Sequence, residues 1–449
     1  MLRLKGQFFN SSNISQKKIF IIVLAVLPFL IIENVDQYVP DFIVDFNTSP
    51  LGIGLYVCIF IAYLIVQFYL IKFIDWNSKS MKSRSYLVKA VQTGIVIAQI
   101  SLAVNAGLVV AAILLFSTYS IISLIFVTFV SNIMAAVILF LFAARFLTWA
   151  TINRHSLGII LFALGFLTLG FSEVVAGIGG SYLVSNKELM VTAQSKVEFA
   201  DFPEGSFFNL YYDNYYDYFD YASFILILLG TASLLYNYSR KINKIKLAVI
   251  IALPIVGYTS TLLDTFDIYD TDTNPDLLSY YIFQSLSKMS GIILFAISFI
   301  YVARKLPDSP IRLFLQIIAL GFVMLAISNH IDVNVAAYPP YGTNSFSLLP
   351  IATYTILFGL FASALSLSQD ISLRNHLKSL ARSDKNLLSS IGTAQMDKEV
   401  RRVVGELKSV IDKEENEIAE ESRIATPLEE DEISDYLKQV VEEVQRSRK

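Results

Sequence analysis

The chain has 449 residues, of which 55% are hydrophobic and 16% are charged, with a mean hydropathy of +0.57 and a net charge of −3. This composition excludes an ordinary soluble globular protein, in which about a quarter of the residues are charged. The single cysteine, Cys58, excludes a disulfide framework. The apolar runs are long and continuous rather than alternating, which excludes a β-barrel. Because backbone groups in lipid must be satisfied within the segment, the sequence predicts an all-α, polytopic membrane helical bundle.

Ten apolar segments follow one another along the chain, most of them long enough for a helix to cross about 30 Å of hydrocarbon. They are residues 19–36, 51–74, 88–116, 120–149, 156–182, 222–239, 245–264, 278–303, 311–331 and 346–368. The first is the weakest, because its apolar run extends only from Ile19 to Ile32. A run of this length also fits the core of a signal peptide. No small-x-small cleavage pattern follows it, so we expect an uncleaved first helix.

Basic residues sort to one side of these ten segments. With the N-terminus inside, the N-terminus and the inner connections, counted together with the edges of the adjoining segments, hold 4, 5, 2, 4 and 3 Lys and Arg residues, 18 in all. The outer connections hold only Lys187 and Lys196. This bias is the strongest orientation signal in a membrane sequence. It predicts a multi-pass protein of the cell membrane with both termini in the cytoplasm. Trp76 and Trp149 then lie at cytoplasmic ends of segments, where interfacial aromatic anchors are expected.

Two charged residues, Glu173 and Lys288, lie deep in apolar segments. Each is nine or ten residues from the outer end of its segment, or roughly 14–16 Å below the outer surface. Intramembrane charges are costly and are usually paired or functional. Small residues surround Glu173 at helical spacing, and Gln284 and Tyr281 share the helix face of Lys288, so we expect both charges to face protein. They form either a structural salt bridge or a pair that moves protons or substrate; a third alternative is that they do not meet.

Acidic residues crowd the outer connection between the seventh and eighth segments. Asp270, Asp272 and Asn274 have the opening spacing of an EF-hand loop, and Asp276 follows. Pro275 stands where an EF-hand needs glycine, and the twelfth position holds no glutamate, so the sequence predicts only a weak cation loop.

Other chemistry is mostly excluded. One cysteine and three scattered histidines form neither a zinc site nor a pair of haem ligands. The chain has no Gly-rich phosphate loop. We therefore predict no catalytic residue, no metal and no cofactor, and a protein that is not an enzyme.

The last eighty residues form a charged tail. We divide the chain into a transmembrane domain, residues 1–369, and a helical cytoplasmic tail, residues 370–449, with 14 basic and 18 acidic residues. Apolar residues from Met396 to Ile411 repeat at helical spacing, and Thr426 and Pro427 begin a second helix. These stripes are too short to bury themselves. They predict contact with each other, with a second copy or with a cytoplasmic protein through residues 396–445, the alternative being a solvated tail.

The junction between the last segment and the tail resembles a known type of protein. The strings Ser368-Gln-Asp-Ile-Ser-Leu-Arg374 and Ser389-Ser-Ile-Gly-Thr-Ala-Gln-Met396 look like the end of uncharacterised archaeal multi-pass membrane proteins. Those proteins resemble the multi-span membrane sensors of histidine kinases. The resemblance implies a last span that feeds a cytoplasmic helix, without any kinase domain.

These features predict a sensory, receptor-like or scaffolding membrane protein that signals through its tail, with the lipid bilayer and a protein as partners and no nucleic acid. The alternative is a secondary transporter that uses the Glu173–Lys288 pair. An unbroken helix from the last span into the tail would favour the sensor. Broken helices at a cavity in the middle of the membrane would favour the transporter.

Overall fold

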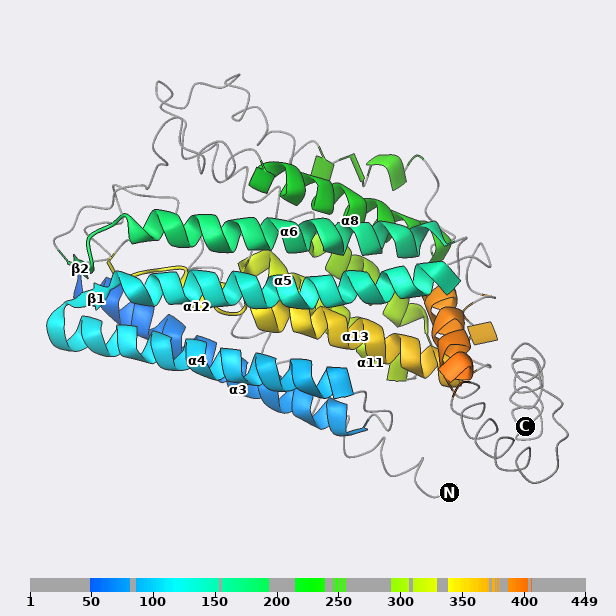
Figure 1. Ribbon diagram of the computed structural model, residues 1–449, viewed down its shortest axis with the longest axis horizontal. Coiled ribbons are helices and arrows are strands. Elements are labelled where there is room, and N and C mark those ends of the chain that lie inside the picture. Colours follow the sequence, from blue (N-terminus) through cyan, green and yellow to red (C-terminus); the bar gives the residue numbers. More distant parts are fainter. Residues whose placement is uncertain are drawn as a thin grey trace, which may run out of the picture.

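The protein is a bundle of long helices. The computed structural model describes residues 49–80, 86–152, 156–193, 215–238, 245, 247–249, 251–252, 254–255, 292–306, 310–328, 338–370, 374–375, 377, 379, 387–402 and 405. Within these ranges the chain is almost entirely helical, with one antiparallel pair of three-residue strands (Figure 1). The all-α class is therefore confirmed.

The labelled elements occur in the following order: α3 (Pro50–Ser80), α4 (Tyr86–Phe116), β1 (Thr118–Ser120), α5 (Ile121–Ile152), α6 (Leu157–Ser185), β2 (Met190–Thr192), α8 (Asp217–Tyr238), α11 (Pro310–Ser328), α12 (Thr343–Phe346) and α13 (Leu349–Gln369). Residues 292–305 are also helical. Seven stretches within these helices are long and apolar enough to cross a membrane, and the last of them combines α12 with α13. The polytopic membrane class follows from these seven helices.

The seven helices correspond to seven of the ten predicted segments. Segment 19–36 lies outside the described residues. Segment 245–264 is described only at a few helical positions, and segment 278–303 only from residue 292 onward. Ten spans therefore stay a prediction.

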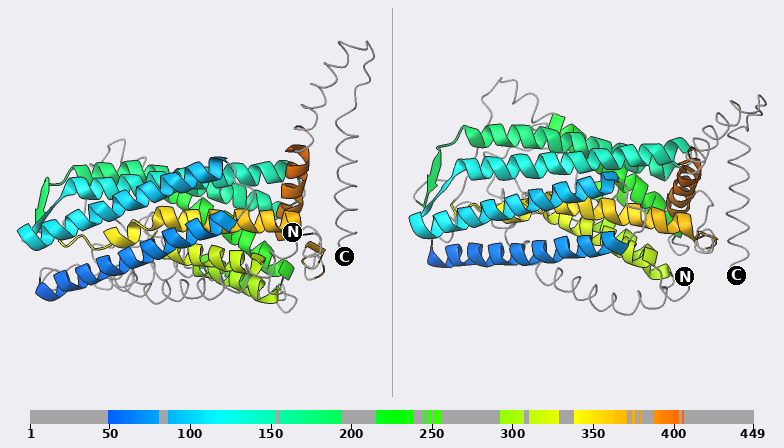
Figure 2. Two further views of the ribbon diagram at one scale, coloured as in Figure 1. Left: turned by 90° about the horizontal axis from the view of Figure 1, so that it is seen from below. Right: turned by 60° about the horizontal axis from the view of Figure 1, so that its bottom comes forward.

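Consecutive helices run in opposite directions between two ends of the bundle (Figures 1 and 2). One end carries the β1–β2 pair and is called the β1–β2 end; the other, where α13 terminates, is called the Gln369 end. Helix α8 finishes at the Gln369 end, because the Lys305 amine donates a hydrogen bond to the carbonyl oxygen of Tyr238 there (2.6 Å). Helix α11 starts at the same end. The two segments predicted between α8 and α11 lie largely outside the described residues and stay a prediction.

The basic residues of the described chain also sort by end. Lys187 belongs to the β1–β2 end. The others belong to the Gln369 end: Lys72, Lys79, Lys89, Arg145, Arg304, Lys305, Arg312, Arg374, Lys398, Arg401 and Arg402. The predicted orientation was drawn from these same residues, so the cytoplasmic position of the Gln369 end stays a prediction.

Glycines allow the central helices to approach closely. A Cβ atom at Gly170 of α6 would lie 2.9 Å from the ring of Phe140 in α5, and one at Gly177 would lie 2.9 Å from Asn132 of α5. Helices α11 and α13 are equally close, because a Cβ at Gly359 would lie 2.9 Å from the backbone oxygen of Phe314. In lipid, such contacts hold helices together by close packing rather than by a hydrophobic driving force.

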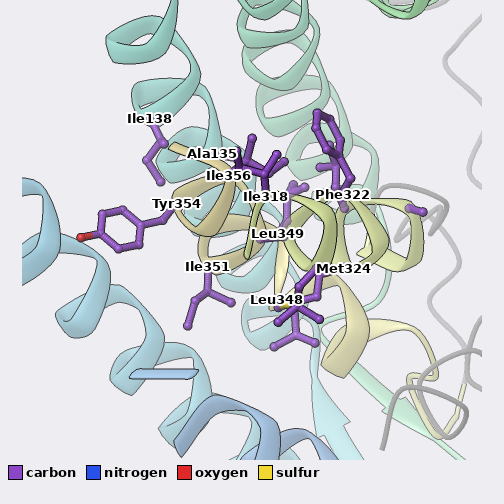
Figure 3. Packing of buried hydrophobic residues seen from close by; sticks show 14 of the residues in the cluster. Ala135, Ile138, Ile318, Phe322, Met324, Leu348, Leu349, Ile351, Tyr354 and Ile356 are labelled. Carbon is purple, nitrogen blue, oxygen red and sulfur yellow. The ribbon is translucent and has the colours of Figure 1, made fainter. Parts of the chain in front are cut away.

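The apolar core lies where α11 and α13 pack beside α5. Figure 3 shows Ile318 and Phe322 of α11 together with Ile356 of α13, and Ile138 of α5 beside them. Tyr354 of α13 is also buried, and its ring points away from the α11–α13 contact. Helix α13 is thus a central helix, surrounded by the others.

Candidate functional site: the junction of the bundle and residues 387–402

A helix of the tail packs on the end of the membrane bundle. Residues 387–402 are helical and are called the cap helix. Figure 2 shows this helix, in orange and brown, lying across the Gln369 end of α5, α6 and α13. Leu387, Leu388, Ile391 and Ala394 are buried and belong to the same apolar cluster as the membrane helices. The bundle therefore covers the first turns of this helix, and the predicted contact of residues 396–445 with each other, a second copy or a protein partner begins beyond them and stays a prediction.

The cap helix contacts two membrane helices at close range. A Cβ atom at Gly392 would lie 2.7 Å from the Cβ of Leu367 in α13. A Cβ atom at Gly158, in the first turn of α6, would lie 3.5 Å from the Cδ1 of Leu387. Glycine at these two positions allows the cap helix to sit directly on the helix ends.

Gln395 forms the polar contact between the cap helix and α5. Its side chain is fully buried, and its Oε1 accepts hydrogen bonds from Arg145 Nη2 (2.6 Å) and from Trp149 Nε1 (3.1 Å). Its Nε2 donates to Glu399 Oε1 one turn along the cap helix (3.1 Å). One neutral side chain therefore accepts hydrogen bonds from two donors of α5. An apolar residue at position 395 would leave both donors without this acceptor.

Arg145 lies between two aromatic rings. Its guanidinium carbon is 5.4 Å from the ring centroid of Trp149 and 5.3 Å from that of Phe361 in α13. Cation–π contacts of this kind stabilise a partly desolvated guanidinium and fix its orientation. The Nε atom of Arg145 is buried and has no hydrogen-bond acceptor. Arg145 thus joins α5, α13 and the cap helix at one point.

Charged side chains of the cap helix interact with Arg145. Glu399 is near enough to interact with Arg145 electrostatically, and it also pairs with Arg402 at 3.1 Å. Burial lowers the pKa of the Lys398 amine, and the positive charge of Arg145 lowers it further, while Glu399 acts in the opposite direction. Glu399 therefore interacts with basic residues of both α5 and the cap helix.

The last span does not run unbroken into the tail. Helix α13 ends at Gln369, and Asp370 adopts an extended conformation with φ −127° and ψ 100°. Arg374, which follows the break, is buried, and its Nη1 contacts the sulfur of Met396 in the cap helix. The connection between α13 and the cap helix is therefore made by side-chain packing and not by a continuous helix.

The residues singled out in the sequence have mixed outcomes. Glu173 is 3% exposed and faces protein, as predicted, with Gly170 and Gly177 of the same helix against α5. Its predicted partner, Lys288, and the supporting residues Gln284 and Tyr281 lie outside the described residues. The pair therefore stays a prediction.

The cation loop of Asp270, Asp272, Asn274 and Asp276 also lies outside the described residues.

A buried carboxylate that the sequence analysis missed is Asp220, which is 5% exposed near the start of α8. Asp220 lies two residues before the predicted segment 222–239, so the sequence placed it in the outer connection rather than in a helix.

A second polar site lies where the chain enters α13. Gln67 of α3 donates hydrogen bonds to Tyr63 of the same helix and to Gln99 Oε1 of α4, and Gln99 Nε2 donates to the carbonyl oxygen of Ser347 (3.2 Å). Gln99 is 17 residues from the end of α4 at Phe116, or about 25 Å along the helix. The turn of Ser347 and Leu348 that links α12 to α13 therefore lies beside the middle of α4 and is buried in protein; both residues have right-handed helical dihedral angles.

The cavity beside this site is small. It is lined by residues of α4, α5 and the α12 region, among them Asn105, Ser123 and Thr343, and its volume of about 10 Å³ holds at most one water. A larger, open hollow of about 350 Å³ lies on the other side of Gln67, between α3 and α4, and apart from Gln67 its lining is apolar.

The sequence analysis did not identify Arg145 and Gln395 as a contact, and their sequence surroundings explain why. Arg145 stands one turn before Trp149 near the end of an apolar segment, and Gln395 interrupts an apolar stripe. Both could be read as solvated or interfacial residues. Trp149 was predicted to be an interfacial anchor, but it is 1% exposed and faces the cap helix. Two sequence features could have indicated the contact. Arg145 and Trp149 are one helical turn apart at the end of an apolar segment, and Gln395 is a single polar residue within the apolar face of a helix in the tail.

No protein family, curated protein or solved structure matches this chain. The resemblance of the junction to archaeal membrane proteins and kinase sensors therefore stays a prediction.

Proposed function

We propose that this chain is a receptor-like or scaffolding membrane protein whose cap helix links the membrane bundle to a cytoplasmic protein. The observation that supports this proposal most directly is the buried Gln395, which receives hydrogen bonds from Arg145 and Trp149 of α5. A shift or rotation of α5 would change both bonds at once. The cap helix would then move with the bundle rather than independently of it.

The position of the cap helix supports a relay role. It touches α5, α6 and α13, so it can respond to the relative positions of three membrane helices. Its far end carries exposed charges at Arg401 and Arg402, and forty-seven residues of sequence follow. A partner that binds those residues would be connected to the bundle through one packed helix. Coupling of this kind needs a contact between elements that can rearrange, and the hydrogen bonds of Gln395 are the part of this contact that a movement of α5 would change.

The experiment compares complexes solubilised from membranes that contain three forms of the chain. The full chain should migrate in a larger complex, whereas a chain ending at Arg402 should migrate alone because it keeps the cap helix but lacks the residues that follow. Gln395→Ala weakens docking and leaves the rest of the tail intact, so it should change the amount of the complex. The same migration for all three forms would reject the proposal.

A secondary transporter is the second candidate, and one observation favours it. The carbonyl oxygen of Ser347, in the buried turn between α12 and α13, accepts a hydrogen bond from Gln99 halfway along α4. Interruptions of a helix at this depth are typical of transporter binding sites. In the Cys58→Ser background, cysteines at Thr343 and Ser347 should react with a membrane-impermeant maleimide from both sides of the membrane in a transporter, unlike a control at the buried Ala352. Protection of all three from both sides would contradict transport through this site.

A further inference from the structure

An open hollow lies between α3 and α4, which run side by side along one side of the described bundle (Figure 1). Its volume is about 350 Å³, and its lining includes Phe60, Leu64 and Phe68 of α3 and Ile100 and Val104 of α4. Phe68, Ile100 and Val104 are exposed, so the hollow opens outward, toward the position of lipid in a membrane. At the Phe60 end α3 touches α4, because a Cβ atom at Gly107 would lie 3.7 Å from the Phe60 ring. The hollow is therefore accessible from the bilayer.

Gln67 brings a polar side chain to this apolar lining. It is 3% exposed, and its Nε2 donates hydrogen bonds to Tyr63 and to Gln99 Oε1. The direction of these bonds is fixed, because Gln99 Nε2 donates to the carbonyl oxygen of Ser347, which can only accept. Gln67 must therefore turn its amide nitrogen toward Gln99. Its Oε1 accepts no hydrogen bond from the described residues, and it is the polar atom that this side chain offers to the hollow.

This oxygen lies within the apolar span. Gln67 precedes Lys72, the last residue of the span on α3, by five residues, or about 7–8 Å along the helix. Hydrocarbon supplies no hydrogen-bond donor, and a carbonyl oxygen that lacks a donor is unfavourable in an apolar environment. The other lining residues are apolar, and the rings of Phe60 and Phe68 provide a large contact area. The hollow thus combines an apolar surface with one acceptor that needs a donor.

We propose that the hollow binds an uncharged, lipid-soluble molecule that carries a hydroxyl group, which donates a hydrogen bond to Gln67 Oε1. The apolar body of this molecule lies between α3 and α4, beside Leu64 and Val104. The lining residues include no charged side chain, so the site does not select a charged head group. Through Gln67 and Gln99, the bound molecule is connected to the turn at Ser347 that begins α13. The proposal does not depend on the receptor role or on the cap helix.

Equilibrium binding of radiolabelled para-nonylphenol to the full chain in phosphatidylcholine nanodiscs tests the site, with empty nanodiscs as the blank for partition into lipid. The wild-type chain should bind the phenol saturably. The methyl ether para-nonylanisole has the same apolar body but no hydrogen to donate. It should therefore compete about ten-fold less well, the effect of one hydrogen bond lost to a buried group. Gln67→Leu should remove this preference, because leucine has no acceptor.

A second pair of variants locates the binding without changing the hydrogen bonds of Gln67. Val104 and Leu108 are both exposed and stand one helical turn apart on α4, but Leu108 does not line the hollow. Val104→Trp should fill the hollow and abolish saturable binding, whereas Leu108→Trp should bind the phenol like the wild type. This pair decides the location even if Gln67→Leu does not fold.

Four results would overturn the proposal. The wild-type chain could show no saturable binding of the phenol. The phenol and the anisole could compete equally in the wild type, which would mean that the hydroxyl donates nothing to Gln67 and that water is the donor there. Val104→Trp could bind like the wild type, or Leu108→Trp could lose binding to the same extent, and either result would place the phenol outside the hollow.

Discussion

Replacement of Gln395 by alanine should release the cap helix from the bundle. The change removes the one acceptor that Arg145 Nη2 and Trp149 Nε1 share. A buried donor that loses its acceptor costs about 1–3 kcal/mol. Arg145 is partly exposed and recovers some hydration, so the two losses together should be near 2 kcal/mol. That free energy corresponds to a roughly thirty-fold larger population of the open cap helix.

Hydrogen–deuterium exchange of the full chain in nanodiscs measures this opening directly. Peptides from residues 387–402 should exchange about thirty-fold faster in Gln395→Ala, while peptides from α5 and α6 should change little, because local opening sets the rate. Thr393→Ala is the matched control: its hydroxyl donates to the carbonyl oxygen of Ser389 within the cap helix and makes no bond to α5. If both variants exchanged at the same rate, the Gln395 contact would not hold the cap helix, and the reasoning would fail.

Three further predictions concern the membrane bundle. Gly359→Ala should destabilise the chain by about 1–3 kcal/mol in thermal unfolding, because the new Cβ would clash with α11, whereas Gly54→Ala, with open space around it, should be neutral or slightly stabilising. If Glu173 pairs with Lys288, Glu173→Gln or Lys288→Met alone should cost on the order of 3–5 kcal/mol, and the double variant should cost less than either. Glu188→Cys in the Cys58→Ser background should react with an impermeant maleimide on intact cells, because β2 and the residues before it belong to the end predicted to be outside.

Each of these has a clear contrary result. Equal midpoints for Gly359→Ala and Gly54→Ala would mean that the α11–α13 contact is looser than the structure shows. Strictly additive losses for the two charge variants would mean that Glu173 and Lys288 do not interact. Reaction at position 188 only after permeabilisation would invert the topology.

Hydropathy and charge predict the membrane helices well because both are properties of continuous stretches of sequence. The bilayer requires continuous apolar stretches of a fixed length, and it sorts Lys and Arg by side. Seven predicted segments are helices in the structure for this reason. The burial of Glu173 was predictable from the same kind of pattern, since small residues at helical spacing mark a face that packs on protein.

The junction was not predictable in this way because it depends on contacts between distant residues. Gln395 and Arg145 are 250 positions apart, and nothing near either residue identifies the other. The turn before α13 is similar: the stretch from Thr343 onward reads as one apolar segment, and the polar contact of Ser347 with Gln99 is seen only in the structure. Local pattern determines which segments enter the membrane, whereas tertiary packing determines which polar residues meet.

The central claim is that the cap helix packs on the membrane bundle in the same chain, and a designed disulfide tests it most directly. A Cβ atom at Gly158 would lie 3.7 Å from the Cβ of Leu387, within the range that a disulfide requires. Gly158→Cys combined with Leu387→Cys, in the Cys58→Ser background, should therefore form an intramolecular disulfide on mild oxidation of membranes. Gly158→Cys with Gly405→Cys should not, because the surroundings of Gly405 are open. Absence of the first cross-link, or its formation only between two chains, would contradict the account.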